Sequence, residues 1–420
     1  MAQVSTGSDP IADWAASGVP SLTGRPDGPP LLPPGRAATV ARAWSDRIAV
    51  ATRGAVRVDG ARLLGERAAL TGFTRHGRRS AGGSCRLLPT ADGWAAVSCA
   101  RPGDPALLGA LIGEAADGDP WPAVADWLRR TPGADLAARA ELLGVPAAPL
   151  PRAARPGTSA DVHAATPGTS ADVHGPARSL VGLRVVDFSA LWAGPLAASL
   201  LGLAGAEVVK VETPQRLDGA RRGNPDFYRL LHAGHRSVLL DPALPRGRAA
   251  MAALVASADV VIEAARPRAL AGFGLDAAEA VDAGVTWISI TAGGRASNRV
   301  GFGDDVAAGA GLVARDGDGA PVFVGDAIAD PLTGLAAATL ALSAPPGGQL
   351  IDLAMADVVA GTLEPAPPEP APPEPARAAH RAAGGWVLDG SHPVAAPVAR
   401  AVTGTAPEPG ADTDAVLARL

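Results

Sequence analysis

The turn from residue 189 to residue 195 joins a predicted strand to a predicted helix in a way that suits ligand binding. An apolar run over 183–188 predicts a buried parallel strand, and Gly194-Pro195 opens an Ala/Leu-rich helical run. The backbone N–H groups at a helix N-terminus lack partners within the helix, so an anionic or amide-rich ligand can dock against them. A second strand over 207–212 completes a strand–helix–strand unit with a right-handed crossover. The sequence therefore predicts that this turn is the ligand cradle of an enzyme.

A second chemical feature is the carboxylate of Asp330, which stands immediately before Pro331 and a long helical run. Asp followed by Pro is a favoured pair at the N-cap and first position of a helix, so the residues alone predict that Asp330 caps a helix beginning at Pro331. A carboxyl group in that position would also have helix N–H groups beside any oxyanion formed on it. Asp304 and Asp305 form a further acidic pair, which we place on a strand, where adjacent side chains point to opposite faces.

The elements that must position these groups fall into six segments. We predict a degenerate partial repeat of the large domain at 1–75, a small α+β domain at 76–150, a linker at 151–178 that contains the octapeptide PGTSADVH twice, a large α/β domain at 179–362, a proline-rich spacer at 363–378 and a tail at 379–420 that returns to the large domain. The repeat is inferred from an offset of 291 residues, which separates Asp13 from Asp304 and places Thr39 opposite Asp330. The fold class predicted is α/β, with a Rossmann-like, open, mostly parallel sheet and a smaller α+β domain placed N-terminally.

Composition narrows the classes of function. The chain has 37 basic and 42 acidic residues, which argues against a nucleic-acid partner because phosphate contacts need a surplus of Lys and Arg. No apolar run reaches the ~18 residues of a membrane span, and the first residues do not resemble a secretory signal. With two cysteines and no Cys or acidic partners at ligand spacing for His163 and His174 of the octapeptides, we expect neither a disulfide framework nor a metal site. A cytoplasmic location is the resulting expectation.

From residue 180 onward the chain resembles the family III CoA-transferases, the group of formyl-CoA transferase, carnitine CoA-transferase and α-methylacyl-CoA racemase. The matching segments stand in family order: 183–189 with 193–195, 205–212, 236–238 with Asp241, 258–263, 266–267, 274–275, Asp330 with 333–334, and 348–349. Residues 90–94 and 143–148 resemble the small domain of the same family, which normally follows the large one. The chain is therefore identified as a permuted or truncated-fusion member of this family.

The resemblance implies a chemistry for these residues. Asp330 would be the nucleophile, which forms a mixed anhydride with the acyl group of an acyl-CoA and then an aspartyl-CoA thioester. The substrates would be an acyl-CoA and a carboxylic acid acceptor, no cofactor would be held covalently, and the protein would be a homodimer. The implied CoA-binding residues are Ala190, Leu191, Trp192, Ala193 and Gly194 in the turn, with Thr213, Arg236, Leu240, Ala264, Ala265 and Arg266 on the adenine and phosphate side.

Several positions depart from the family pattern. Ala264 and Ala265 stand where an Asn and a bulky apolar residue are usual, so Arg236, Arg266 or Arg268 would bind the phosphates or would form only a solvated rim. The histidine of the racemase branch falls at Asp304, which disfavours racemisation.

Two further readings remain beside acyl-CoA chemistry. An NAD enzyme is disfavoured because the turn at 189–195 holds a single glycine in place of G-x-G-x-x-G. A protein that kept the fold but only binds CoA, or serves as a scaffold, is the other alternative. Racemase, isomerase or dehydratase-type reactions of an acyl-CoA remain the alternatives within the same fold.

Overall fold

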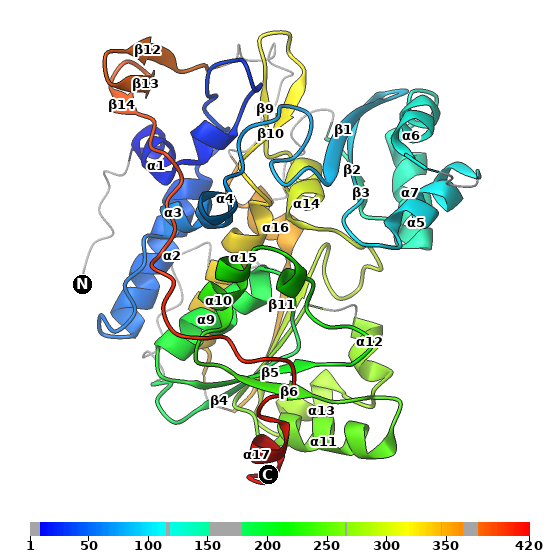
Figure 1. Cartoon of the computed structure of the whole chain (residues 1–420), viewed down its shortest axis with the longest axis vertical. Helices are drawn as coiled ribbons and strands as arrows, with labels where there is room; N and C mark the ends of the chain where they lie inside the picture. Colours follow the sequence, from blue (N-terminus) through cyan, green and yellow to red (C-terminus); the bar gives the residue numbers. More distant parts are fainter. Residues whose placement is uncertain (1–8, 115–117, 152–178, 265–266, 346, 364–376) are drawn as a thin grey trace.

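A six-stranded parallel sheet forms the centre of the large domain (Figure 1). The computed structural model describes residues 9–114, 118–151, 179–264, 267–345, 347–363 and 377–420. In spatial order the strands are β11 (Gln349–Ala354), β8 (Thr286–Thr291), β7 (Val260–Glu263), β4 (Arg184–Asp187), β5 (Glu207–Glu212) and β6 (Arg236–Leu239). The first of these six strands along the chain, β4, lies inside the sheet, and the chain adds strands first on one side of it and then on the other. This is the strand order of a doubly wound sheet, and the predicted α/β fold is confirmed.

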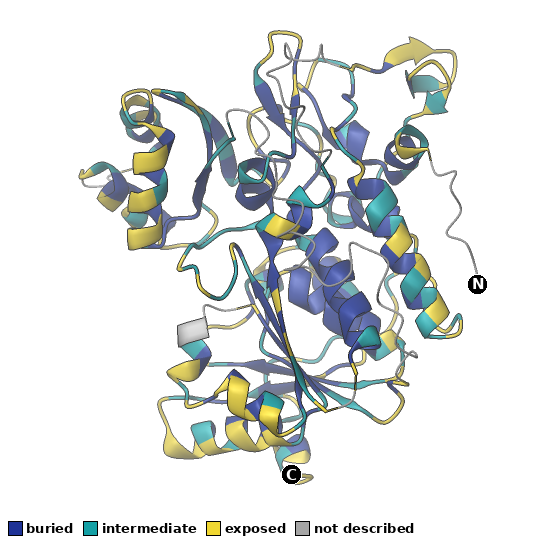
Figure 2. Ribbon diagram, turned by 180° about the vertical axis from the view of Figure 1, so that it is seen from behind, coloured by how far each residue is buried: buried dark blue, intermediate teal, exposed yellow. Residues whose placement is uncertain are grey.

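Both faces of this sheet are covered because its strands are apolar on both sides. Val185, Val260 and Ile288 pack on one face against α9 (Ala193–Leu203), α10 (Pro225–His232), α15 (Ala329–Ser343) and α16 (Met355–Ala360). Val186 and Trp287 pack on the other face against α11 (Pro245–Ala256), α12 (Pro267–Ala271) and α13 (Ala277–Asp282). Figure 2 shows the buried residues gathered in the sheet and the helices beside it, while the outer helices expose one side.

The N-terminal helices belong to the core of the large domain. These elements are α1 (Pro10–Ser17), η1 (Val19–Leu22), α2 (Ala37–Ala51), α3 (Gly60–Leu63) and α4 (Glu66–Thr71). Trp14, Ala41 and Ile48 are buried in the same apolar cluster as Leu335 of α15. The first helices therefore complete one face of the large domain rather than enclosing a core of their own.

The smaller α+β unit projects from one side of the molecule (Figure 1). Its antiparallel sheet consists of β1 (Cys85–Thr90), β2 (Gly93–Ser98) and β3 (Ala147–Pro149), and it is covered by α5 (Asp104–Ile112), α6 (Trp121–Leu128) and α7 (Gly133–Leu143). The unit meets the large domain at α14 (Gly303–Gly309), where Ala308 packs against Cys85 and Leu87. A two-stranded ribbon follows α14, made of β9 (Val313–Arg315) and β10 (Pro321–Phe323).

The C-terminal tail spans the length of the molecule (Figure 1). It begins with a small antiparallel sheet, β12 (His380–Ala382), β13 (Gly385–Leu388) and β14 (His392–Pro393), which packs against α1. It ends with α17 (Thr413–Leu417) beside β6, where Asp412 forms an ion pair with Arg236 at 2.9 Å and Thr413 accepts a hydrogen bond from the backbone N–H of Leu239. The tail thus covers the outer edge of the parallel sheet, which would otherwise be open to pairing with another strand. Among the described residues, no helix is long and apolar enough to cross a membrane.

Close helix packing predicts an unusual response to a Gly→Ala substitution at Gly334. An alanine normally stabilises a helix interior by about 1 kcal/mol relative to glycine. A Cβ atom at Gly334, however, would lie 2.7 Å from the carbonyl oxygen of Ala193, at the start of α9. We therefore expect Gly334→Ala to lower the free energy of unfolding by about 1–3 kcal/mol.

Urea denaturation of the Gly334→Ala variant measures this loss. The control is Gly317→Ala, because a Cβ atom at Gly317 would meet open space. An unchanged or increased stability for Gly334→Ala would contradict the packing described at this contact.

Candidate active site

Asp330 is the second residue of α15, so the prediction that it caps a helix beginning at Pro331 is wrong. The helix begins at Ala329, the N-cap position is held by Ile328, and the backbone N–H of Asp330 donates to the carbonyl of Ala327 at 2.9 Å. The hydrogen bond between Asp330 and Ala327 closes a turn that starts the helix at Ala329, one residue before the Asp-Pro pair. A carboxylate in the first turn still lies at the positive end of the helix dipole, which favours its charged form.

The α14 helix presents its start to the Asp330 carboxylate. A Cβ atom at Gly303 would collide with Oδ2 of Asp330 and with the carbonyl of Ala327, so glycine is needed for this approach. Asp304 follows, and its Oδ1 accepts a hydrogen bond from the backbone N–H of Ala327 at 2.8 Å. Because α14 is a helix, the expectation that Asp304 and Asp305 lie on a strand is also wrong.

Asp305 faces away from this group, as the pair was expected to diverge. Its Oδ1 accepts hydrogen bonds from the hydroxyl of Ser98 at 2.8 Å and from the backbone N–H of Phe302 at 2.9 Å. Asp304 therefore belongs to the site at Asp330, whereas Asp305 anchors the start of α14 to the small unit.

A buried ion pair connects Asp330 with the turn at 189–195. The guanidinium of Arg67, on α4, donates to both carboxylate oxygens of the fully buried Asp326, at 2.8 and 2.6 Å. The same guanidinium lies 5.0 Å from the ring centroid of Trp192, within the range of a cation–π contact. Arg67 thus stands between the predicted ligand cradle and the carboxylates around Asp330.

The acidic groups in this site hold protons at higher pH than ordinary aspartates. Burial raises the pKa of Asp330, Arg67 lowers it and the nearby charges of Asp304 and Asp326 raise it, and the net result is a pKa of about 7. Burial and Asp326 likewise raise the pKa of Asp304 to about 7. A carboxyl group that titrates near neutral pH can be a charged nucleophile or a proton donor under physiological conditions.

A buried polar network centred on Lys210 holds the turn at 189–195 in place. Lys210 of β5 donates to the carbonyl of Ser189 and forms an ion pair with Asp218 at 3.0 Å. Burial alone would lower the pKa of Lys210, but Asp187 and Asp218 raise it above its ordinary value, so the ammonium stays charged. Asp218 in turn accepts a hydrogen bond from the backbone N–H of Leu191 at 3.0 Å.

Two residues other than glycine adopt left-handed backbone conformations at this site. Leu191 has a φ of 71° and Ala327 a φ of 43°. In each case a buried carboxylate accepts the hydrogen bond of the strained residue's own N–H, Asp218 for Leu191 and Asp304 for Ala327. Strained backbone of this kind costs roughly 1–3 kcal/mol and gathers at functional sites.

Most of the residues predicted to bind CoA lie at the carboxyl ends of the parallel strands. The turn at 190–194 follows the carboxyl end of β4, Thr213 follows β5, Leu240 follows β6 and Ala264 follows β7. Because the strand order reverses at β4, these carboxyl ends are where doubly wound sheets generally bind ligands. Leu191 exposes its side chain there, while the side chain of Trp192 is fully buried.

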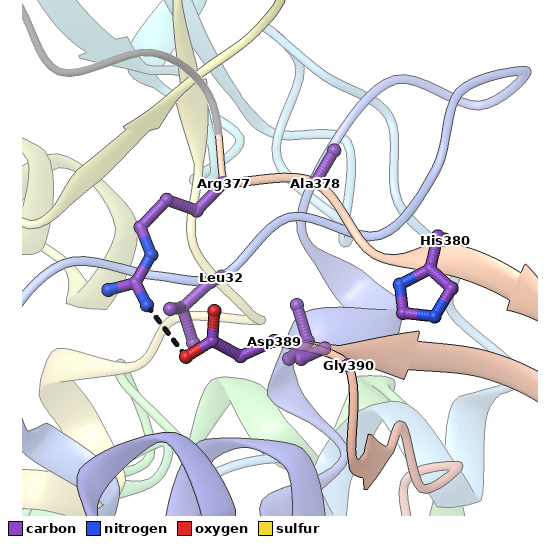
Figure 3. Close-up of a pocket in the computed structure, with 7 residues that line it drawn as sticks. Leu32, Arg377, Ala378, His380, Asp389 and Gly390 are labelled. Atoms are coloured by element: carbon purple, nitrogen blue, oxygen red, sulfur yellow. Dashed lines mark hydrogen bonds and ion pairs between the residues drawn. The ribbon is translucent and has the colours of Figure 1, made fainter.

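Among the described residues predicted for the phosphate side, Arg236 does not join this group. Arg236 is the first residue of β6, so it lies at the amino ends of the strands, and it forms an ion pair with Asp412 of the tail. Ala265 and Arg266 lie outside the described residues, as do His163 and His174 of the linker. Figure 3 shows a separate cavity of about 310 Å³, lined by Leu32 and residues between Arg377 and Gly390, and none of the predicted site residues that the structure describes is among its lining residues.

Comparison with known proteins decides the family. The family model described as CoA-transferase family III matches residues 180–396, just over half of the chain. The chain belongs to CoA-transferase family III. This result confirms the resemblance seen in the sequence.

Relatives within family III match about half of their own length. The succinate–glutarate CoA-transferase of Agrobacterium fabrum is 33% identical over 210 residues, which cover 44% of this chain and 52% of the relative. The succinyl-CoA–D-citramalate CoA-transferase of Chloroflexus aurantiacus is 31% identical over 213 residues, which cover 46% and 53%. A solved CAIB/BAIF family protein from Brucella suis is 30% identical and covers 44% of this chain and 55% of its own, with a TM-score of 0.40. This chain therefore spans about half the length of the curated relatives that it matches.

Sequence reasoning missed the residues that connect the parts of this candidate site. Arg67 and Asp326 are 259 residues apart, and neither stands in a motif that marks it. Lys210 did carry a signal, because it is the only lysine in the chain and it stands inside an apolar strand. A charged residue in such a strand must find a buried partner, but the sequence does not identify Asp218 as that partner.

The raised pKa of Asp330 predicts a pH-dependent stability. The native state keeps a proton on Asp330 up to about pH 7, whereas the unfolded chain releases it near its ordinary value of 3.8. The unfolded state therefore binds fewer protons between these values, so this group's contribution to stability is lost as pH rises from about 4 to 7. We expect Asp330→Asn to be more stable than the native protein by up to about 4 kcal/mol at pH 8, with little difference at pH 4.

Urea denaturation of both proteins at a series of pH values tests this expectation. Asp318→Asn is the control, because the Asp318 side chain is 70% exposed. A difference between Asp330→Asn and the native protein that does not change with pH would show that Asp330 is an ordinary, charged carboxylate.

Proposed function

We propose that this protein transfers CoA from an acyl-CoA to a carboxylic acid, with Asp330 as the covalent nucleophile. The observation that carries the proposal is the position of Asp330, a carboxylate with a pKa of about 7 in the first turn of α15, near the turn at 189–195 of a family III chain. Relatives are named for succinate and glutarate or for D-citramalate, and on this ground we propose dicarboxylic acids as candidate acceptors.

The proposed reaction begins at the acyl-CoA thioester. A carboxylate oxygen of Asp330 attacks the thioester carbonyl, the carbon–sulfur bond breaks, and a mixed anhydride and free CoA thiolate result. The thiolate then attacks the side-chain carbonyl of Asp330, which releases the donor carboxylate and leaves an aspartyl-CoA thioester. The acceptor carboxylate repeats the exchange in reverse: it displaces the thiolate to form a second anhydride, and the thiolate takes the acceptor acyl group and frees Asp330.

The residues around Asp330 suit these steps. The start of α15 favours the negative charge of the attacking carboxylate and of the oxyanions that form on either side of it. Asp304, with a pKa of about 7, can hold a proton beside the departing carboxylate. The turn at 190–194, which opens α9, offers backbone N–H groups to the CoA molecule at the carboxyl ends of the parallel strands.

A CoA-binding protein without transferase activity is the second candidate. The observation that favours it is the full burial of the Trp192 side chain, together with alanine at Ala264, where the family usually has an asparagine. In this case CoA would raise the thermal stability of the protein, but no acyl group would move.

Trapping of the intermediate separates the two candidates. The protein is incubated with a panel of acyl-CoA donors, including succinyl-CoA, and with free dicarboxylic acids, and hydroxylamine is then added to convert any activated aspartyl group to a hydroxamate. We expect mass spectrometry to find the modification on Asp330. Modification of another residue would overturn the assigned nucleophile, and none with any donor would favour the binding protein.

Substitution of the nucleophile gives a second prediction. Asp330→Ala should reduce exchange by at least about a thousandfold, because no covalent intermediate can form. Its affinity for CoA, measured by calorimetry, should change little, because the proposed CoA contacts lie in the turn at 190–194. Exchange that survives in Asp330→Ala would contradict the mechanism.

The exchange rate of the native protein should also depend on pH. The reaction needs the charged form of Asp330, so kcat should rise through about pH 7 and level off above it. The expected homodimer and cytoplasmic location stay predictions, and sedimentation velocity measures the first of them.

A further inference from the structure

Elements at the start of the chain correspond to elements of the large domain in order and in length. Helices α2 (Ala37–Ala51) and α15 (Ala329–Ser343) both have 15 residues, and their first residues are 292 apart. Each follows a shorter helix, α1 before α2 and α14 before α15, and the connecting segments have similar lengths along the chain. The two long helices pack against each other in the shared core, as equivalent elements do across an approximate twofold axis.

A hairpin repeats the same correspondence further along. β1 ends at Thr90 and β12 at Ala382, and both hairpins continue with a Gly-Trp pair, at Trp94 and Trp386. The repeat therefore extends well beyond the segment that the 291-residue offset reveals in the sequence.

The first copy has lost the carboxylate on which the proposed chemistry depends. The second residue of α15 is Asp330, but the second residue of α2 is Ala38, and Thr39 follows it. The aspartate that matches Asp304 is still present as Asp13, and it now accepts a hydrogen bond from the Thr39 hydroxyl at 2.6 Å. No activated acyl group can form on α2 in this way.

The first copy nevertheless reaches into the site of the second. Arg67 lies on α4, after α2 in the first copy, and binds Asp326 just before α15. Its guanidinium also lies over the Trp192 ring, next to the strained Leu191. The Arg67 side chain thus contacts both the loop before the proposed nucleophile and the turn proposed to bind CoA.

We infer that residues 10–98 are an internal copy of 303–393 that has lost its own nucleophile, and that this copy completes the remaining site by supplying Arg67 as a positioning residue. The inference rests on the proposed function for its kinetic consequences, but the geometry of Arg67 does not depend on that function. The consequence is a single acyl-transfer site per chain, built from both copies.

The charges around Asp330 define what Arg67 contributes. Asp304 faces this region from α14, Asp326 faces it from the loop before α15, and Arg67 is the cation that faces it from α4, while Asp305 faces away from it and acts on Asp330 only as a weaker, more distant charge. Without Arg67, the negative charge of Asp326 would act on Asp330 uncompensated, and Asp330 would hold its proton to higher pH. The loop from 326 to 330 would also lose the contact that ties it to Trp192.

The test compares Arg67→Gln with Arg62→Gln, a control from the same copy whose side chain is 53% exposed. We expect the pH at half-maximal kcat to rise by about one unit in Arg67→Gln, with activity below pH 7 reduced about tenfold and partly recovered at high pH. The double variant Arg67→Gln/Asp326→Asn, which removes both charges, should move the midpoint back toward the native value. Arg62→Gln should leave it unchanged.

A purely structural role for Arg67 would lower the melting temperature without moving the pH midpoint, and that outcome would overturn the inference. If the native protein shows no exchange, the proposed function fails while the positioning role is still measured, by the pH at which stability falls in Arg67→Gln. Calorimetry with CoA counts the sites, and we expect one molecule bound per chain. Two equivalent CoA molecules per chain would overturn the loss of the first site.

Discussion

The bidentate ion pair between Arg67 and Asp326 is the interaction on which the site depends. It joins α4, the loop before α15 and, through the Trp192 ring, the turn that opens α9. A buried ion pair adds little to stability compared with apolar groups of the same volume, but removal of one partner is costly. The pair therefore serves geometry more than stability: it fixes the position of the turn at 189–195 relative to the loop that leads to Asp330, although the two belong to different elements.

Buried carboxylates also hold the two strained backbone positions of the site. Leu191 and Ala327 each direct an N–H group at a buried carboxylate, and each carboxylate has a further restraint around it. Asp218 is held by Lys210, and Asp304 lies beside Asp326 and Arg67. Acidic side chains thus stabilise two unfavourable conformations. At Asp330 and Asp304, burial raises the pKa, and the neighbouring carboxylate of Asp326 raises it as well.

The sequence predicted the parts of this protein that depend on local pattern. The apolar strands at 183–188 and 207–212, the turn at Gly194 and the doubly wound sheet follow from periodicity and from motifs in family order. The start of α15 and the helical state of Asp304 were predicted wrongly, because both depend on the turn at Ala327, which tertiary contacts hold. Arg67, Asp326 and Asp218 were missed because their partners are distant in the chain, and a lone charged residue carries no periodic signal.

The distance along the chain between Arg67 and Asp326 also bears on how the protein reaches its native state. Helices α1 to α4 bury their apolar sides against α15, and Arg67 meets its partner 259 residues later. Glu66 meets Arg400 after a still longer interval of 334 residues. At synthesis rates of about 5–20 residues per second, the first helices emerge from the ribosome roughly 13–50 s before α15 exists. During that interval the apolar faces that will later meet α15 lack this native partner, which leaves them open to non-native contacts.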